Sequence, residues 1–161
     1  MSAEDILKGK RILAVDDEPD VLAVIDEQLD ECRLVKAGDF KAAETYLETE
    51  QFDLVILDIM GVKGFALLDL TREKKVPAVM LTAHAMTPES LQKAVDKGAV
   101  SFLPKDELTR LSELIAEILE DVGAGRTHWP KLMVRLGPRF KELWGELWDE
   151  IRFPEDFKIS W

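Results

Sequence analysis

The chain has 161 residues, of which 47% are hydrophobic and 33% charged, and its formal net charge at pH 7 is −11. This length suits one buried core with a small appendage and is short for two ordinary domains. The acidic excess argues against non-specific binding to nucleic acids, which depends on a basic surface.

The sequence carries no signal for a membrane or an oxidising compartment. No apolar run approaches the ~18 to 20 residues that a membrane span needs, and the N-terminus lacks the apolar core of a signal peptide. Cys32 is the only cysteine, so an internal disulfide is impossible. We therefore expect a cytoplasmic location and no membrane span.

Five apolar runs are predicted to be strands. They cover residues 11–15, 33–37, 52–58, 78–81 and 100–103. The third and fourth runs are nearly continuous, which is typical of strands buried on both faces of a parallel sheet.

Helix-like segments separate these strands and follow the last one. They begin at Pro19, after Asp39, near residue 65, after Thr87 and after Asp106. Asp39, Thr87 and Asp106 are predicted N-caps, and Gly98 and Gly123 are predicted helix ends. The alternation predicts an α/β fold: a doubly wound, flavodoxin-like domain with a five-stranded parallel sheet in the strand order 2-1-3-4-5, plus C-terminal helices.

Three carboxylates stand where two strands end. Asp16 and Asp17 follow the first strand, and Asp58 ends the third. Functional crevices of such sheets lie at the carboxyl ends of the strands, and these two strands are neighbours in the predicted order. A divalent cation with oxygen ligands would relieve the crowding of negative charge, and Mg²⁺ suits such a site.

A hydroxyl and a lysine complete this predicted pocket. Thr82 ends the fourth strand, and Lys105 follows the fifth. A nucleophilic carboxylate beside Mg²⁺, a hydroxyl and a lysine is a site that can receive a phosphoryl group. Taken singly, each residue has a simpler explanation. Asp16 and Asp17 could start a helix, since acids favour helix N-termini. Asp58 could be a loop aspartate, Thr82 a strand-end hydroxyl and Lys105 a solvated lysine.

Four segments, ILAVDDEPD, LVILDIM, VMLTAH and FLPK, occur in this order. Together they resemble the receiver domain of two-component response regulators over about residues 9–122. The resemblance implies that Asp58 accepts a phosphoryl group from a sensor histidine kinase or a phosphotransfer protein. It also implies that Asp17 and Asp58 bind Mg²⁺ directly, that Asp16 does so largely through water, and that Met60 contributes its carbonyl oxygen.

The resemblance assigns further roles around this pocket. Thr82 would be the switch hydroxyl that moves toward the phosphoryl group, Lys105 would contact that group, and Phe102 would be the switch aromatic. Phe102 as an ordinary core residue is the alternative. His84 stands where the family tunes dephosphorylation, or is simply an exposed histidine.

The sequence departs from the family pattern in two places. A Met-Pro pair usually follows the acceptor, with a glycine eight positions after it, whereas Gly64 follows Asp58 by only six. A proline usually follows the lysine, whereas Asp106 follows Lys105. These departures bear on the geometry at Met60, on the lifetime of the phosphoryl group and on any partner that reads this loop.

Residues 126–161 are not expected of a bare receiver domain. They hold seven Lys and Arg against six Asp and Glu, whereas residues 1–125 hold 14 against 26, a net −12. All four tryptophans lie here, in an apolar stripe at helical spacing. We predict a receiver domain over 1–125 and a Trp-rich helical extension over 126–161, with a helix from Pro130, a break at Gly137-Pro138 and a helix to about Ile151.

The extension has three possible partners. Its stripe packs on the receiver domain, mediates dimerisation or capture of another protein, or binds a membrane surface. A DNA-binding output is not expected, because about 36 near-neutral residues leave no room for a helix-turn-helix domain.

The sequence thus predicts a phosphorylation-dependent switch that signals through protein–protein contacts. We expect no enzyme activity beyond phosphoryl transfer to the chain itself and autodephosphorylation. The alternative is a constitutive scaffold whose C-terminal helices bind a downstream protein or a second copy regardless of phosphorylation.

Overall fold

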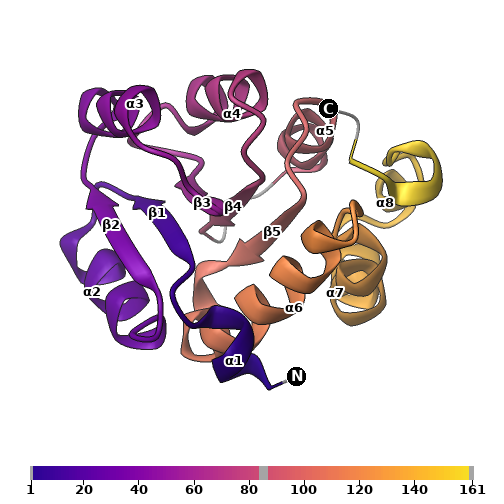
Figure 1. The fold of residues 1–161 in the computed structure, drawn as a ribbon. Helices are drawn as coiled ribbons and strands as arrows, with labels where there is room; N and C mark the ends of the chain where they lie inside the picture. The colour runs from indigo at the N-terminus through magenta and orange to yellow at the C-terminus, as the bar shows by residue number, and fades with distance from the viewer. Residues whose placement is uncertain (1, 84–86, 160–161) are drawn as a thin grey trace.

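The computed structural model describes residues 2–83 and 87–159. Its centre is a five-stranded parallel sheet in the order β2-β1-β3-β4-β5 (Figure 1). The strands are β1 Arg11–Val15, β2 Arg33–Ala37, β3 Leu54–Asp58, β4 Ala78–Thr82 and β5 Ser101–Pro104. The predicted fold class and strand order are confirmed.

Helices cover both faces of this sheet (Figure 1). On one face lie α3 Phe40–Thr49, α4 Gly64–Glu73 and α5 Pro88–Asp96; on the other lie α1 Ala3–Leu7, α2 Pro19–Gln28 and α6 Leu111–Gly123. Because both faces are covered, all five residues of β3 and of β4 are buried, which explains their continuous apolar sequences.

Two of the predicted N-caps, Asp39 and Thr87, are confirmed. The Asp39 side chain accepts a hydrogen bond from the Ala42 N–H at 2.8 Å at the start of α3. Thr87 does the same for the Ser90 N–H at 3.1 Å at the start of α5. Each bond satisfies one backbone donor that the first turn of a helix leaves without an intrahelical partner.

The predicted cap at Asp106 is wrong. A 3-10 helix, η1 Lys105–Arg110, follows β5, and α6 begins only at Leu111. The Asp106 carboxylate instead forms an ion pair with Arg139 at 3.0 Å. The Asp106 side chain, which the local sequence predicts to be a cap, thus pairs with Arg139 of the C-terminal extension.

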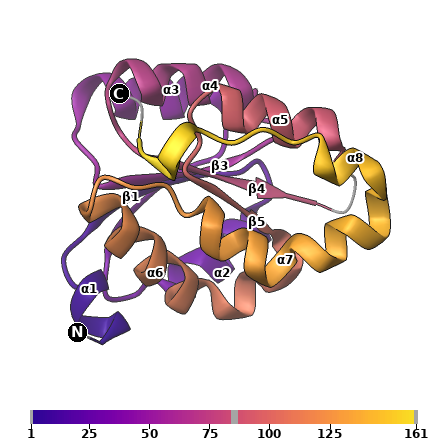
Figure 2. The same ribbon diagram turned by 90° about the vertical axis from the view of Figure 1, so that its right-hand side faces the viewer.

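The extension forms α7 Trp129–Trp144, α8 Glu146–Asp149 and a short 3-10 turn, Glu155–Phe157. It lies along the β5 side of the sheet, between α5 and α6 (Figure 2). One stripe of α7, made of Trp129, Leu132, Leu136 and Phe140, is buried in the hydrophobic core. Of the possible partners of this stripe, the structure shows the α/β domain of the same chain.

The predicted break at Gly137-Pro138 is wrong, because α7 continues through Pro138. Proline removes one backbone hydrogen bond, but burying Leu136 and Phe140 on the same stripe as Leu132 outweighs that loss. The helix ends instead at Gly145, whose φ of +58° suits a residue without a side chain.

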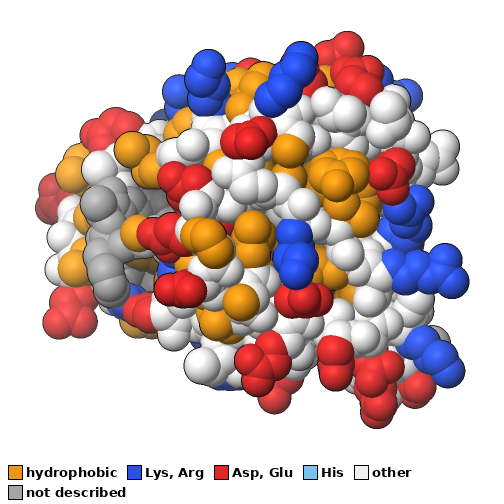
Figure 3. Space-filling view, turned by 90° about the vertical axis from the view of Figure 1, so that its left-hand side faces the viewer, with side chains coloured by type: hydrophobic (Ala, Val, Ile, Leu, Met, Phe, Trp, Pro, Cys, Tyr) orange, Lys and Arg blue, Asp and Glu red, His pale blue; other side chains and the backbone are white. Residues whose placement is uncertain are grey.

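Within the part of the chain that is described, none of the helices has the length and apolar character needed to cross a bilayer. The face shown in Figure 3 carries mixed charges, with acidic side chains gathered around a hollow at its left. This distribution agrees with the acidic balance of the first 125 residues.

Candidate functional site

The strand register brings the predicted site residues to one edge of the sheet. Val15 pairs with Leu57 across β1 and β3, so Asp16 and Asp58 follow side by side. Asp58 in turn pairs with Leu81, which places Thr82 one residue beyond it on β4. Three neighbouring parallel strands therefore end in polar side chains at the same edge.

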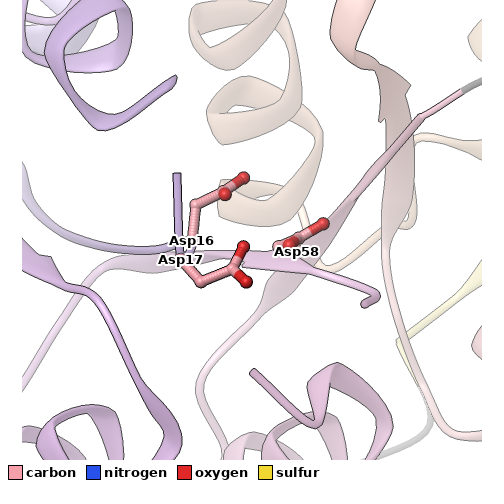
Figure 4. Close-up of side chains that lie close together, drawn as sticks. All are labelled: Asp16, Asp17 and Asp58. Carbon is pink, nitrogen blue, oxygen red and sulfur yellow. The ribbon is translucent and has the colours of Figure 1, made fainter. Parts of the chain in front are cut away.

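Three carboxylates meet there (Figure 4). Asp16, Asp17 and Asp58 each offer an oxygen, and these oxygens lie within 4.8 Å of one another. Asp16 is fully buried and Asp58 is 4% exposed, whereas Asp17 is exposed. Three clustered carboxylates with one open side suit a hard divalent cation that keeps some of its water ligands, as Mg²⁺ does.

Lys105 is the cation that the chain itself supplies to this cluster. Its Nζ lies 2.9 Å from Asp16 Oδ2, 3.3 Å from Asp58 Oδ1 and 3.5 Å from Glu18 Oε2. Burial opposes the charged form, but the hydrogen bond and charge of Asp16 outweigh it and raise the pKa of Lys105. The ammonium group therefore stays charged beside two carboxylates.

Ionisation of the Asp58 carboxylate is unfavourable in this pocket. Burial, followed by the negative charge of Asp16, raises the pKa of Asp58 from 3.8 to about 6, although Lys105 acts in the opposite direction. A second positive charge, such as a bound divalent cation, would lower this pKa again. The pocket is thus built to gain from binding a cation.

This raised pKa predicts a pH-dependent stability in the absence of Mg²⁺. Between about pH 4 and pH 6 the folded chain binds more protons at Asp58 than the unfolded chain, so the free energy of unfolding falls as the pH rises through this window. Asp58→Asn should remove that loss. Its free energy of unfolding should exceed that of the wild type by about 2 kcal/mol above pH 7 and should equal it near pH 4. Urea unfolding at both pH values measures the difference, and a constant difference would contradict the assignment. Saturating Mg²⁺ should reduce or reverse it.

A pocket of about 440 Å³ opens above Asp58. Thr82, which is 5% exposed, lines it together with Met60 and Lys105. The hydroxyl-bearing Ser90 of α5 also lines this pocket, and the sequence offered no signal for it because Ser90 lies on a helix, away from any strand end. His84, the predicted tuning residue, lies outside the described residues.

Two glycines, Gly61 and Gly64, allow the short loop after Asp58 to pass close to the site. A Cβ on Gly61, whose φ is +81°, would stand 2.4 Å from Asp17 Oδ2, and one on Gly64 would stand 2.1 Å from the Asp58 carbonyl oxygen. Val62 between them is 1% exposed and packs in the core. The shortened loop therefore runs directly against the carboxylate cluster, which only residues without side chains permit at these two points.

Gly61→Ala should accordingly weaken Mg²⁺ binding by about 10-fold to 100-fold, because the new methyl group displaces Asp17. Gly9→Ala is the matched control, since Gly9 has a similar φ of +74° but no atom within 4 Å of its Cβ position. Calorimetric titration with Mg²⁺ measures both variants. If Gly61→Ala binds Mg²⁺ as tightly as Gly9→Ala, the approach of this loop to Asp17 has no effect on the metal site.

Phe102 lies on β5 and is 1% exposed. Its ring centroid lies 5.3 Å from that of Phe140 and 6.0 Å from that of Trp129, both in α7. A second cavity, of about 860 Å³, is lined by Thr82 and Lys105 on one side and by Phe140 and Trp144 on the other. The extension therefore borders the candidate site.

A buried histidine connects the start of α7 to β5 and α6. The His128 ring lies between Ser101 Oγ (2.7 Å from Nδ1) and Glu117 Oε1 (2.8 Å from Nε2). Burial lowers the pKa of His128 and so favours the neutral ring, although the hydrogen bond and the negative charge of Glu117 act in the opposite direction. The sequence did not predict these contacts, because Ser101 and Glu117 lie 27 and 11 positions before His128 and no local pattern relates them.

Known proteins resemble this chain in sequence. The family model described as the response regulator receiver domain matches residues 12–118. The two-component response regulator ARR18 of Arabidopsis thaliana is 36% identical over 103 residues, which cover 60% of this chain and 16% of that protein. The transcriptional regulatory protein TcrA of Mycobacterium tuberculosis is 31% identical over 118 residues, which cover 70% of this chain and 46% of that protein.

Solved structures give the same result. A response regulator receiver domain protein (CheY-like) from Methanospirillum hungatei JF-1 matches with a TM-score of 0.64 and 25% identity, over 70% of this chain and 95% of that one. The receiver domain of NtrX from Brucella abortus matches with a TM-score of 0.55 and 30% identity, over 66% and 98%. The chain thus spans nearly all of these solved chains but less than half of the curated relatives named above.

Proposed function

The chain belongs to the family of response regulator receiver domains, and on this premise we propose that it is a signalling switch that accepts a phosphoryl group on Asp58. The observation that carries the proposal is Lys105, which is shared between Asp16 and Asp58 beside a pocket lined by Thr82. Receiver domains are phosphoacceptors in two-component signalling, and this pocket has the groups that such chemistry needs.

In the proposed reaction Asp58 is the nucleophile. One of its oxygens donates an electron pair to the phosphorus of a phosphohistidine, the P–O bond forms, and the P–N bond breaks with its electrons returning to the imidazole. Lys105 neutralises charge on the phosphoryl oxygens, and the Thr82 hydroxyl donates a hydrogen bond to one of them. The donor would be a sensor histidine kinase or a phosphotransfer protein.

The proposed cofactor is Mg²⁺. Asp17 and Asp58 would hold the ion directly and Asp16 largely through water, with the Met60 carbonyl oxygen as a further ligand, and the oxygen-only donor set fits the ion. When bound, Mg²⁺ supplies positive charge that offsets the negative charge of the transferring group. We further propose the division into a receiver domain over 1–125 and a Trp-rich extension over 126–161, and a cytoplasmic location.

Beryllofluoride, which mimics a phosphoryl group on a carboxylate, tests this function. In the presence of Mg²⁺ it should bind the full chain with a stoichiometry of one, as measured by titration calorimetry. Absence of binding, or undiminished binding to Asp58→Asn, would overturn the proposal.

A second candidate function is a constitutive scaffold. It is favoured by three large hydrophobic side chains that stand exposed on the extension, namely Val134, Leu143 and Leu147. They would contact a second copy or another protein whatever the state of Asp58. Light scattering separates the two candidates, since a scaffold keeps one mass with and without beryllofluoride and loses its assembly when the exposed Val134, Leu143 and Leu147 are replaced by serine.

A further inference from the structure

We propose that the second half of α7, together with α8, is the output element of the switch and is released when Asp58 is phosphorylated. This inference rests on the proposed function and adds the segment, residues 139–150, through which the phosphorylated state is expressed. The region matched by the family model ends at residue 118, so the segment lies outside it.

Anchors hold both flanks of residues 139–150. The Trp129 indole N–H donates to the Ala99 carbonyl oxygen at 3.1 Å, and the His128 backbone N–H donates to Val100 at 2.8 Å. On the other flank, the backbone N–H and carbonyl of Arg152 both bond to the Gln92 side chain, at 2.8 and 2.9 Å. Only the part between these anchors is free to respond without unfolding the extension.

The segment itself is held through contacts that begin at the phosphoacceptor site. Lys105 contacts Asp16 and Asp58, and the next residue, Asp106, pairs with Arg139 at 3.0 Å. One residue further, Glu107 pairs with Arg135 at 3.2 Å. Lys105, Asp106 and Glu107 are therefore consecutive in η1. The lysine would contact the phosphoryl group, and the two acids pair with arginines of α7.

The pair with Arg139 gives a role to Asp106, which stands where the family usually has a proline. Asp106 replaces the usual proline, and its carboxylate supplies the partner of Arg139. A proline at this position would have no charge with which to hold α7.

A second contact connects the site to the segment through aromatic rings. Thr82 and Phe102 line the 860 Å³ cavity that Phe140 and Trp144 close from the α7 side. The Phe140 ring lies 5.3 Å from Phe102 and 4.8 Å from Trp144. Movement of Thr82 toward a phosphoryl group opens space beside Phe102, and this open cavity lets the ring move away from Phe140.

The direction of the change follows from charge. A phosphoryl group adds about 1.5 to 2 negative charges to Asp58 and draws Lys105 away from Asp16. Because Lys105 begins η1, its movement shifts Asp106 relative to Arg139. The pair of Glu107 with Arg135 is less exposed and keeps the first half of α7 in place. The half-exposed Asp106–Arg139 pair has little energy to resist this shift.

The helix contains a point about which its second half can turn. Pro138 has no N–H to donate within α7, and Gly137 before it has no side chain that stiffens the turn. Movement about Gly137-Pro138 leaves the Trp129 anchor in place and separates Phe140 and Trp144 from Phe102.

Hydrogen–deuterium exchange of the full chain, with Mg²⁺ and with or without beryllofluoride, tests the inference. We expect amides of residues 139–150 to exchange at least about threefold faster with beryllofluoride, and those of 129–136 to stay unchanged. Unchanged exchange in 139–150 while calorimetry shows that beryllofluoride binds would overturn this inference alone. Failure of beryllofluoride to bind would overturn the proposed function and this inference with it.

A pair of charge-matched variants sharpens the test. Arg139→Gln should speed exchange in 139–150 about threefold without beryllofluoride and reduce the further increase on adding it, because the pair with Asp106 is already lost. Lys131→Gln is the control: Lys131 is similarly exposed and pairs with Asp121 at 3.1 Å, but in the anchored half of α7. Equal responses of the two variants would contradict a specific role of the Asp106–Arg139 pair.

Discussion

Asp58→Asn is expected to lower the incorporation of a phosphoryl group from acetyl phosphate by at least about 100-fold, because an amide lacks the charge and nucleophilicity of a carboxylate. The mass of the intact protein, followed over time with Mg²⁺, measures incorporation. The change should leave the fold intact, since asparagine has nearly the same shape as aspartate.

Asp53→Asn is a suitable control for this experiment. Asp53 directly precedes β3, at the opposite end of the strand from Asp58, and accepts a hydrogen bond from the Arg11 backbone N–H at 2.8 Å. Its substitution changes the net charge equally but should leave incorporation unchanged. Full incorporation into Asp58→Asn would place the acceptor elsewhere in the chain.

Trp129→Ala is expected to destabilise the whole chain by about 3 to 5 kcal/mol, because it leaves a large cavity between α7 and the sheet. Trp129 is fully buried, packs against Phe102 and Phe153, and donates a hydrogen bond to Ala99. The midpoint and slope of urea unfolding, followed by circular dichroism, measure the loss. A single transition would show that the extension and the receiver domain unfold together.

Trp129→Phe separates the two contributions of this side chain. It keeps an aromatic ring and loses the hydrogen bond to Ala99, so about 1 to 2 kcal/mol should be lost. If Trp129→Ala costs less than about 1 kcal/mol, the extension is not a part of the receiver core.

Much of the fold follows from local patterns in the sequence. The continuous apolar residues of β3 and β4 predicted buried parallel strands, and Asp39 and Thr87 predicted two helix starts. These features depend on neighbours in the chain, and the structure confirms them. The convergence of Asp16 and Asp58 required one further step, the strand order, which short βα connections restrict strongly.

Features set by distant residues were not predictable in this way. Asp106 was predicted as a cap because it precedes an apolar helix, but Arg139, 33 residues later, is its partner. Helix α7 continues through Pro138 because the burial of Phe140 against Phe102 offsets the missing hydrogen bond. The sequence contains both residues of each pair, but no local rule relates them.

The C-terminal extension changes the interpretation of the site. In the sequence it was a separate appendage with its own charge balance, whereas in the structure it closes one side of the cavity next to Thr82 and Lys105. A phosphoryl group on Asp58 would therefore act on a surface to which α7 already contributes. The proposed output segment follows from this arrangement.

The most direct test of the account is to locate the phosphoryl group after reaction with acetyl phosphate and Mg²⁺. Acyl phosphates are reduced by borohydride, so the modified residue can be identified in peptides by mass spectrometry. We expect one modified residue, Asp58, and no modification when Mg²⁺ is chelated before acetyl phosphate is added. Modification of another residue, or modification of Asp58 that is independent of Mg²⁺, would contradict it.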